Sequence, residues 1–279
     1  MSLLRRQQLV RLAREYDALI ITDDVYDQLQ WTSSAPSPTS PDLRKAQIPR
    51  LVDVDRMLDG GAQRPIADGF GNAASNGSFS KILGPGVRTG WVEGTPKFAH
   101  GVSQTGTSRS GGAPSHLTAT FVADLLESGE LQEHIFSCLQ PSYERRYRNM
   151  LDAIRRHLVP LGAKLPQEER EVVGGYFIWV WLPVNAVALA KRAREMENLI
   201  VAEGAIFEVP GDREVANFPN EVRLCFAWED EEKLGEGIER LASLVKLMLA
   251  EKRDCDCSDV GRPNAEEGRE EQEFQSTLW

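Results

Sequence analysis

The stretch GSFSKILGPGVRTGW, residues 77–91, places one lysine, Lys81, among small and hydroxyl-bearing residues, with Arg88 shortly after it. So few apolar side chains lead us to expect that the stretch packs no core. Most lysines are solvated surface residues, so its position alone assigns no role to Lys81. A lysine amine can also form a Schiff base, for which it must lose its proton and reach a buried carbonyl. The spacing therefore raises carbonyl chemistry at Lys81 as one hypothesis, with a solvated loop lysine as the other.

The neighbours of Lys81 suit a bulky anionic partner. Gly77, Ser78 and Ser80 are small enough for the backbone to approach a cofactor. Ser78 and Arg88 suit an anion, since the hydroxyl donates one hydrogen bond and the guanidinium two. An aldehyde cofactor that carries a phosphate meets all of these needs. Pyridoxal phosphate is such a cofactor.

A second cluster, TDDVYD, places Asp23 and Tyr26 three residues apart, directly after a short apolar run. One interpretation is structural: Asp23 caps a turn and Tyr26 packs. The other is chemical, because pyridoxal phosphate needs a carboxylate to keep its ring nitrogen protonated and a donor at its phenolic oxygen. This pair supplies both groups.

A third candidate is Arg223 in EVRLCFAW, residues 221–228. If this segment is a strand, Val222, Leu224 and Phe226 face the core, while Arg223 shares the other face with Cys225. Arg223 is then either an edge-strand arginine in water or a two-point clamp for a substrate carboxylate, for which its planar fork is suited.

The elements that must position these residues follow from the hydrophobic pattern. Residues 3–16 have helical spacing, and ALIIT (18–22) predicts a buried strand, so a parallel sheet with helices on its faces is expected. Ligands of such sheets bind beyond the carboxyl ends of the strands, where Asp23 lies. Residues 31–41 are rich in Ser and Pro and predict a loop. Further strands are expected at 90–94, 174–183 and 221–228, and helices at 115–126, 131–138, 141–158, 186–203 and 231–249.

Composition narrows the class of protein. The 279 residues carry a net charge of −10, which argues against a nucleic-acid binder, and no apolar run reaches membrane-spanning length. Four scattered cysteines indicate a reducing compartment, and we expect a cytoplasmic protein. Cys255 and Cys257 have no second pair or histidine nearby, so no metal site is expected. Residues 251–279 are acidic and poor in apolar residues, which predicts a disordered tail.

Taken in order, DDVY (23–26), SFSKILGPGVRTGW (78–91) and VRLCFA (222–227) resemble class I/II aminotransferases of the fold-type I pyridoxal-phosphate-dependent family. The likeness is greatest to the aminoadipate and aromatic aminotransferase branch and covers about residues 1–250. It implies an α/β fold: 1–140 as part of the large domain, with a mainly parallel sheet flanked by helices, and 141–250 as a smaller α+β carboxy-terminal domain. It also implies transfer of an amino group between an α-amino acid and a 2-oxo acid, and a homodimer in the full-length form. The roles it implies are Asp23 at the pyridine nitrogen, Tyr26 at the phenolic oxygen, Ser78 and Arg88 at the phosphate, Lys81 at the aldehyde and Arg223 at the substrate carboxylate.

One departure from the family concerns the amino terminus. Family members carry a long portion before this point, with a phosphate-binding loop, an aromatic residue that stacks on the ring and an Asn-Pro-x-Gly motif. The chain therefore resembles the carboxy-terminal part of an aminotransferase, through truncation or a misplaced start codon. We expect the 279-residue chain to be poorly soluble with little or no activity. Two alternatives stay open: lyase or decarboxylase chemistry on the same scaffold, and a non-enzymatic fragment or cofactor-like half of a regulator.

Overall fold

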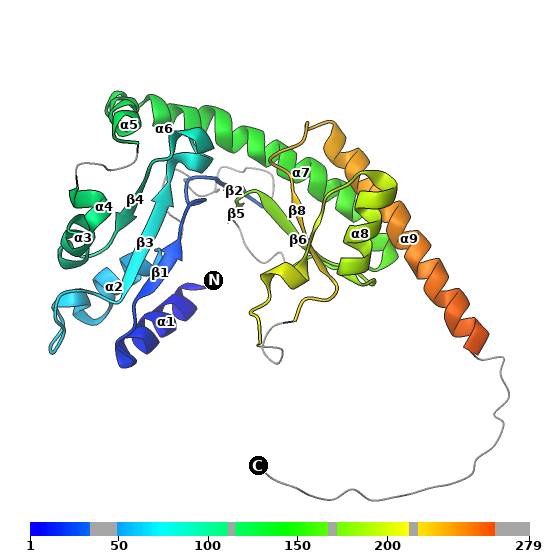
Figure 1. Ribbon diagram of the computed structural model, residues 1–279, viewed down its shortest axis with the longest axis horizontal. Helices are drawn as coiled ribbons and strands as arrows, with labels where there is room; N and C mark the ends of the chain where they lie inside the picture. The colour runs from blue at the N-terminus through cyan, green and yellow to red at the C-terminus, as the bar shows by residue number, and fades with distance from the viewer. Residues whose placement is uncertain (34–48, 111–114, 167–171, 212–216, 260–279) are drawn as a thin grey trace, which may run out of the picture.

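The computed structural model describes residues 1–33, 49–110, 115–166, 172–211 and 217–259. Its strands form three small sheets: β1–β3–β4, β2–β5 and β6–β8–β7. Figure 1 shows the first sheet in the blue and cyan part of the chain and the last in the yellow-green part, with the helix α7 (Gln140–His157) running across both. In these ranges no helix is long and apolar enough to cross a membrane.

The first sheet confirms the expected parallel pairing. β1 (Ile20–Asp23) runs parallel to β3 (Ala73–Ser78), and β4 (Gly90–Glu93) pairs with β3 in the antiparallel sense. α1 (Leu3–Glu15) and α2 (Leu51–Met57) pack on one face through a core of Val10, Leu51, Val54 and Ala73. α3 (Pro96–Ser103) and α4 (Gly106–Arg109) follow β4.

A buried ion pair fixes α1 and α2 to this sheet. The Arg14 guanidinium lies 2.8 Å from a carboxylate oxygen of Asp55, and both side chains are at least nine-tenths buried. The second oxygen of Asp55 accepts the backbone N–H groups of Asn72 and Ala73 at 2.7 and 3.2 Å. Both buried charges are thus compensated, which is the condition under which such a pair is tolerated.

The last sheet lies against the long helices. β8 (Glu221–Cys225) pairs with β6 (Phe177–Trp181) on one side and β7 (Ala202–Glu203) on the other, all antiparallel. Val222, Leu224 and Phe226 are at most 4% exposed, which confirms the predicted strand face. They join the largest hydrophobic core, together with side chains of α7, α8 (Ala186–Glu197) and α9 (Lys233–Asp259).

The strand expected over 174–183 is found in shorter form as β6, Phe177–Trp181, because Gly174 is the last residue of a separate strand in another sheet. β5 (Val172–Gly174) pairs with β2 (Gln30–Thr32), and β6 begins at Phe177. Gly175 between them has φ +86°, a left-handed conformation that glycine adopts without strain and that turns the chain from one sheet to the other. Trp31 and Thr32, predicted as loop, are buried in β2, while residues 34–41 of that loop lie outside the described residues.

Two helix ends also differ from prediction. α8 ends at Glu197 because Asn198 adopts a left-handed conformation, whereas we expected helix to residue 203. α9 continues to Asp259, so the beginning of the predicted disordered tail is helical, and residues 260–279 lie outside the described part. Between α5 (His116–Ser128) and α7, α6 (Glu130–His134) leads into a π-helical turn, Ile135–Leu139, where a single helix was expected over 131–138.

Candidate active site

The lysine segment is a tight turn at the carboxyl end of β3. Ser78 caps a 3₁₀ turn, Phe79–Lys81, by accepting the backbone N–H of Ser80 at 3.1 Å. Phe79 and Ile82 are 8% and 5% exposed, so the expectation that this stretch packs no core was wrong. These two side chains anchor the turn and leave Lys81 between them, half-buried.

Gly77 makes room for an indole. A Cβ on Gly77 would lie 2.1 Å from the Trp91 ring, and Trp91 also packs on Phe79 with ring centroids 4.8 Å apart. The small residue is therefore required by Trp91 of the adjacent strand, whereas the sequence suggested that it admits a cofactor.

The Lys81 amine faces an aromatic wall. Its Nζ lies 5.6 Å from the ring centroid of Tyr26 and 5.6 Å from that of Tyr176. No carboxylate of the described residues lies within 4.0 Å of this nitrogen, so Lys81 has no fixed ion-pair partner there. Two of the predicted site residues, Lys81 and Tyr26, are thus neighbours, as their chemistry requires.

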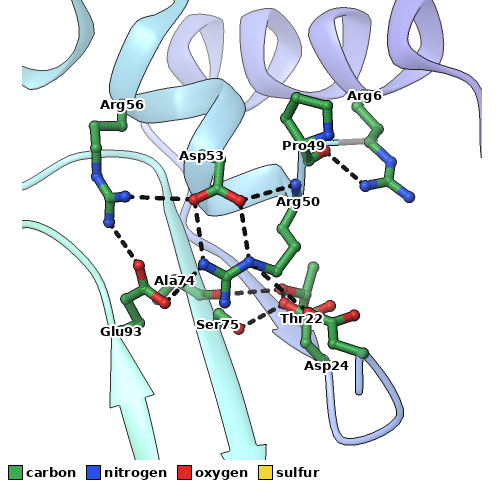
Figure 2. A network of polar contacts seen from close by, with 11 residues as sticks. Arg6, Thr22, Asp24, Pro49, Arg50, Asp53, Arg56, Ala74, Ser75 and Glu93 are labelled. Carbon is green, nitrogen blue, oxygen red and sulfur yellow. Dashed lines mark hydrogen bonds and ion pairs between the residues drawn. The ribbon is translucent and has the colours of Figure 1, made fainter. Parts of the chain in front are cut away.

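Asp23 and Asp24 lie on opposite faces of the first sheet. Asp24 accepts the hydroxyl protons of Thr22 and Ser75, both at 2.6 Å, on the face that α1 and α2 cover (Figure 2). Asp23 is exposed on the other face and accepts one hydrogen bond from the Asn76 side chain at 3.0 Å. Since side chains alternate along a strand, only Asp23 shares its face with Asn76 and Ser78. Asp24 thus links β1 to β3 through two hydroxyl groups, whereas the exposed carboxylate of Asp23 accepts a hydrogen bond from Asn76.

Figure 2 shows a cluster of charges between α2 and the sheet, centred on Arg50. Arg50 lies 2.8 Å from Glu93 of β4 and 3.0 Å from Asp53, and Arg56 binds the other oxygen of Glu93 at 2.8 Å. Burial opposes the charged form of Glu93, but the hydrogen bonds from Arg56 and Arg50 outweigh it and lower the pKa of Glu93. The cluster ties the start of α2 to β4.

Asp27 borders the same cluster, beside a pocket of about 30 Å³. Burial and the negative charge of Asp24 raise the pKa of Asp27 to about 6, although Arg50, 3.8 Å away, acts in the opposite direction. The pocket is lined by Asp24 and Asp27 on one side and by Gly77, Ser78 and Ile82 on the other, so it joins the charge cluster to the lysine turn.

Arg223 is held between two rings. Its guanidinium carbon lies 4.0 Å from the ring centroid of Phe177 on β6 and 4.4 Å from that of Phe207. The Nε atom is buried and has no hydrogen-bond partner among the described residues. A buried donor without a partner is costly unless a ligand satisfies it. A planar carboxylate fits this guanidinium, because it can accept two hydrogen bonds in the plane of the fork.

Ser78 and Arg88 stand apart from this aromatic wall. Ser78 pairs with Gly90 at the end of β3, and Arg88 lies on the connection just before Gly90, exposed, with φ 49°. The Arg88 guanidinium donates to the carbonyl of Pro85 at 3.0 Å. The described structure therefore places both residues beside the lysine turn but joins neither to Lys81 or to the other.

Aromatic contacts connect the two ends of the site. The Tyr26 ring packs on Phe177 at 6.4 Å and on Tyr176 at 5.2 Å, so Lys81 reaches Arg223 through two rings. No motif in the sequence predicts a site role for Tyr176, Phe177, Phe207 or Asn76. For Tyr176 and Phe177, the segment GGYF (174–177) could have indicated a special position, since glycine within a strand often marks a close approach of another group.

These residues fit pyridoxal phosphate. An amine without a carboxylate partner among the described residues, an exposed aspartate at the end of β1 and a guanidinium with an unsatisfied buried donor match the aldehyde, the ring nitrogen and the carboxylate of a bound amino acid. When bound, this cofactor supplies an electron sink for charge that develops on the α-carbon of an amino acid.

Comparison with known proteins agrees with this chemistry. The family Aminotransferase class I and II matches residues 2–241. The chain is 35% identical over 249 residues to the uncharacterised protein YER152C of Saccharomyces cerevisiae, covering 88% of this chain and 52% of that protein. It is 29% identical to aromatic-amino-acid aminotransferase 1 of Thermococcus litoralis, covering 87% of this chain and 49% of the relative.

A solved structure shows the same fold. LysN, an α-aminoadipate aminotransferase of Thermus thermophilus complexed with N-(5'-phosphopyridoxyl)-L-leucine, matches with a TM-score of 0.64 at 26% identity, over 89% of this chain and 55% of that one. The chain thus spans about half the length of the relatives that it matches. With the family match across most of its residues, the chain belongs to the class I and II aminotransferases.

Proposed function

We propose that the protein takes part in pyridoxal-phosphate-dependent transfer of an amino group between an α-amino acid and a 2-oxo acid. The observation that carries this proposal is the aromatic path from the Lys81 amine through Tyr26 and Phe177 to the Arg223 guanidinium. A nucleophilic amine and a carboxylate receptor at the two ends of this path would support such a transfer.

Each of the candidate site residues has a defined role in this reaction. Lys81 would hold the cofactor aldehyde, and its amine would move a proton to and from the substrate α-carbon. Asp23 holds the pyridine nitrogen in its protonated state, and Tyr26 donates to the phenolic oxygen. Ser78 and Arg88 bind the phosphate, for which Arg88 exchanges the Pro85 carbonyl for a phosphate oxygen. Arg223 binds the substrate carboxylate.

The domain division, cellular location, assembly and amino donor of the protein follow from the same proposal. Residues 1–140 would belong to a cofactor-binding domain and 141–250 to a smaller one. The complete protein would act in the cytoplasm as a homodimer, in keeping with the family resemblance. The amino donor would be an aromatic or aminoadipate-like amino acid, as the names of the related enzymes suggest.

Covalent trapping tests the proposal. The chain is incubated with pyridoxal phosphate and reduced with borohydride, and the modified lysine is identified by peptide mass spectrometry. We expect the adduct on Lys81 and its loss in Lys81→Ala. Lys97, ion-paired to Asp68 at 2.7 Å, and Lys164, over the Trp181 ring at 4.5 Å, are internal controls. An adduct mainly on either of these lysines contradicts the proposal.

Whether the chain turns over substrate needs a separate experiment, because it spans about half the length of the relatives that it matches. Within the described residues, β1 pairs only with β3, and Ile21 of β1 is 67% exposed. Leu4 near the start of α1 and Tyr16 at its end are also mostly exposed. Such surfaces favour association with other chains. We expect little activity from residues 1–279 and oxo-acid-dependent activity from a form extended at the amino terminus. Equal activity of the two forms would show that the added segment contributes nothing to the site.

A further inference from the structure

Tyr176 lies at the junction between the lysine turn and the sheet that carries Arg223. Its hydroxyl donates a hydrogen bond to the backbone carbonyl of Lys81 at 2.8 Å. The next residue, Phe177, begins β6, and its ring lies 4.0 Å from the Arg223 guanidinium carbon. Two consecutive residues therefore contact the two ends of the proposed site.

The carbonyl that Tyr176 binds is at the end of a short turn. The 3₁₀ turn ends at Lys81, and the N–H groups of Ile82, Leu83 and Gly84 all donate to the carbonyl of Phe79 instead. Among the described residues, no turn or loop backbone hydrogen bond ends on the Lys81 carbonyl. Its hydrogen bond from Tyr176 is thus a tertiary contact, between residues 95 positions apart in the chain.

The Tyr176 ring is itself held on two sides. It packs against Tyr143 of α7 with ring centroids 4.8 Å apart and against Tyr26 at 5.2 Å. Burial, together with the adjacent Tyr143, raises the pKa of Tyr176 well above its usual range. The phenol therefore keeps its proton and remains a hydrogen-bond donor across the physiological pH range.

We propose that Tyr176 is a positioning residue, which fixes the Lys81 backbone relative to β6 and so sets the spacing between the Lys81 amine and the Arg223 guanidinium. This inference rests on the proposed function, since the spacing matters for an amino acid bound at both ends. The hydroxyl of Tyr176 binds the backbone of Lys81, and Tyr176 meets the Lys81 amine only with its ring, whose centroid lies 5.6 Å away.

The test uses the full 279-residue chain and pyridoxal phosphate. After borohydride reduction, peptide mass spectrometry gives the ratio of adduct on Lys81 to adduct on Lys97 in the parent chain and in Tyr176→Phe. We expect the ratio to fall about fivefold in the variant, the order of effect of one net hydrogen bond. Amide hydrogen exchange of residues 79–84 should also become faster. Tyr147→Phe is the matched control, because its ring packs in the same core on Trp31 and Phe226, and both readouts should stay unchanged.

The outcomes separate this inference from the proposed function. No preference for Lys81 in the parent chain overturns the proposed function and this inference with it. A preference that persists in Tyr176→Phe, with unchanged exchange of residues 79–84, overturns the positioning role alone. If urea unfolding shows that Tyr176→Phe does not fold, Tyr176→Met replaces it, since methionine fills the space with a flexible apolar chain and also lacks the donor.

Discussion

The guanidinium of Arg223 lies 4.0 Å from the ring centroid of Phe177, on the strand paired with its own. The Phe207 ring centroid lies 4.4 Å from the same guanidinium carbon, and the Nε atom is buried. Stacking fixes the direction of the fork without using its donors. A ligand carboxylate can therefore bind without first breaking a hydrogen bond to Nε.

Arg223→Lys should raise KM for the amino acid by about tenfold or more, because an ammonium group makes no planar two-point contact. The yield of pyridoxal phosphate adduct on Lys81 should not change. Steady-state kinetics of the active, extended form measures the first quantity and peptide mapping the second. Arg240→Lys, on a surface pair with Glu197, is the control. Loss of the Lys81 adduct with a normal KM would assign Arg223 to the cofactor.

Asp55→Asn should lower the free energy of unfolding by about 3 kcal/mol, because Arg14 would lose its buried counter-ion and keep only the exposed Asp59 at 3.9 Å. Urea denaturation measures this loss. Asp152→Asn is the control: Asp152 is 66% exposed and lies 3.8 Å from Arg155 on the surface of α7, with no contact to Arg14. The control should change stability by less than about 1 kcal/mol. Equal effects of the two changes would show that burial of the Arg14 pair is unimportant.

Gly77→Ala should destabilise the first sheet by about 1–3 kcal/mol, since its Cβ would overlap the Trp91 ring. Adding Trp91→Ala should remove most of the extra cost of the alanine. Gly86→Ala is the control, because a Cβ there meets no atom within 4 Å. Additive effects of Gly77→Ala and Trp91→Ala in a double-mutant cycle would rule out the contact as the cause.

Asp27→Asn should alter the pH dependence of stability between about pH 4 and pH 6. An unfolded Asp has a pKa of about 3.9, and the folded value is about 6. Between these values the folded chain binds more protons, so the parent chain loses stability as pH rises through this window. The side chain is 40% exposed, and solvent screening keeps the loss below about 1 kcal/mol. The variant should lack this loss, while Asp152→Asn, on exposed α7 surface, should retain it. Parallel curves for Asp27→Asn and the parent would contradict the raised pKa.

The sequence predicted those parts of the site in which one strand decides the geometry. Alternation in Val222, Leu224 and Phe226 placed Arg223 on the opposite face, and the apolar run before Asp23 placed it at a strand end. Other parts depend on tertiary contacts. The run 174–183 is equally apolar whether it forms one strand or two, so only the structure shows the turn at Gly175. α2 is short, and its N-cap residue Arg50 pairs with Glu93, which is distant in sequence. The hydrophobic pattern of α2 alone was therefore too weak to predict the helix.

The π-helical turn Ile135–Leu139 has a mechanical consequence. It lies in a nearly continuous helical rod whose first part, α6, packs on α5, and whose second part, α7, packs on α9 and β2. A π-turn interrupts the regular i to i+4 hydrogen bonding and is a place where helices bend. Bending at this turn would change the angle between the two parts of this rod, so the stiffness of one short helical segment bears on the distance between the Lys81 amine and the Arg223 guanidinium.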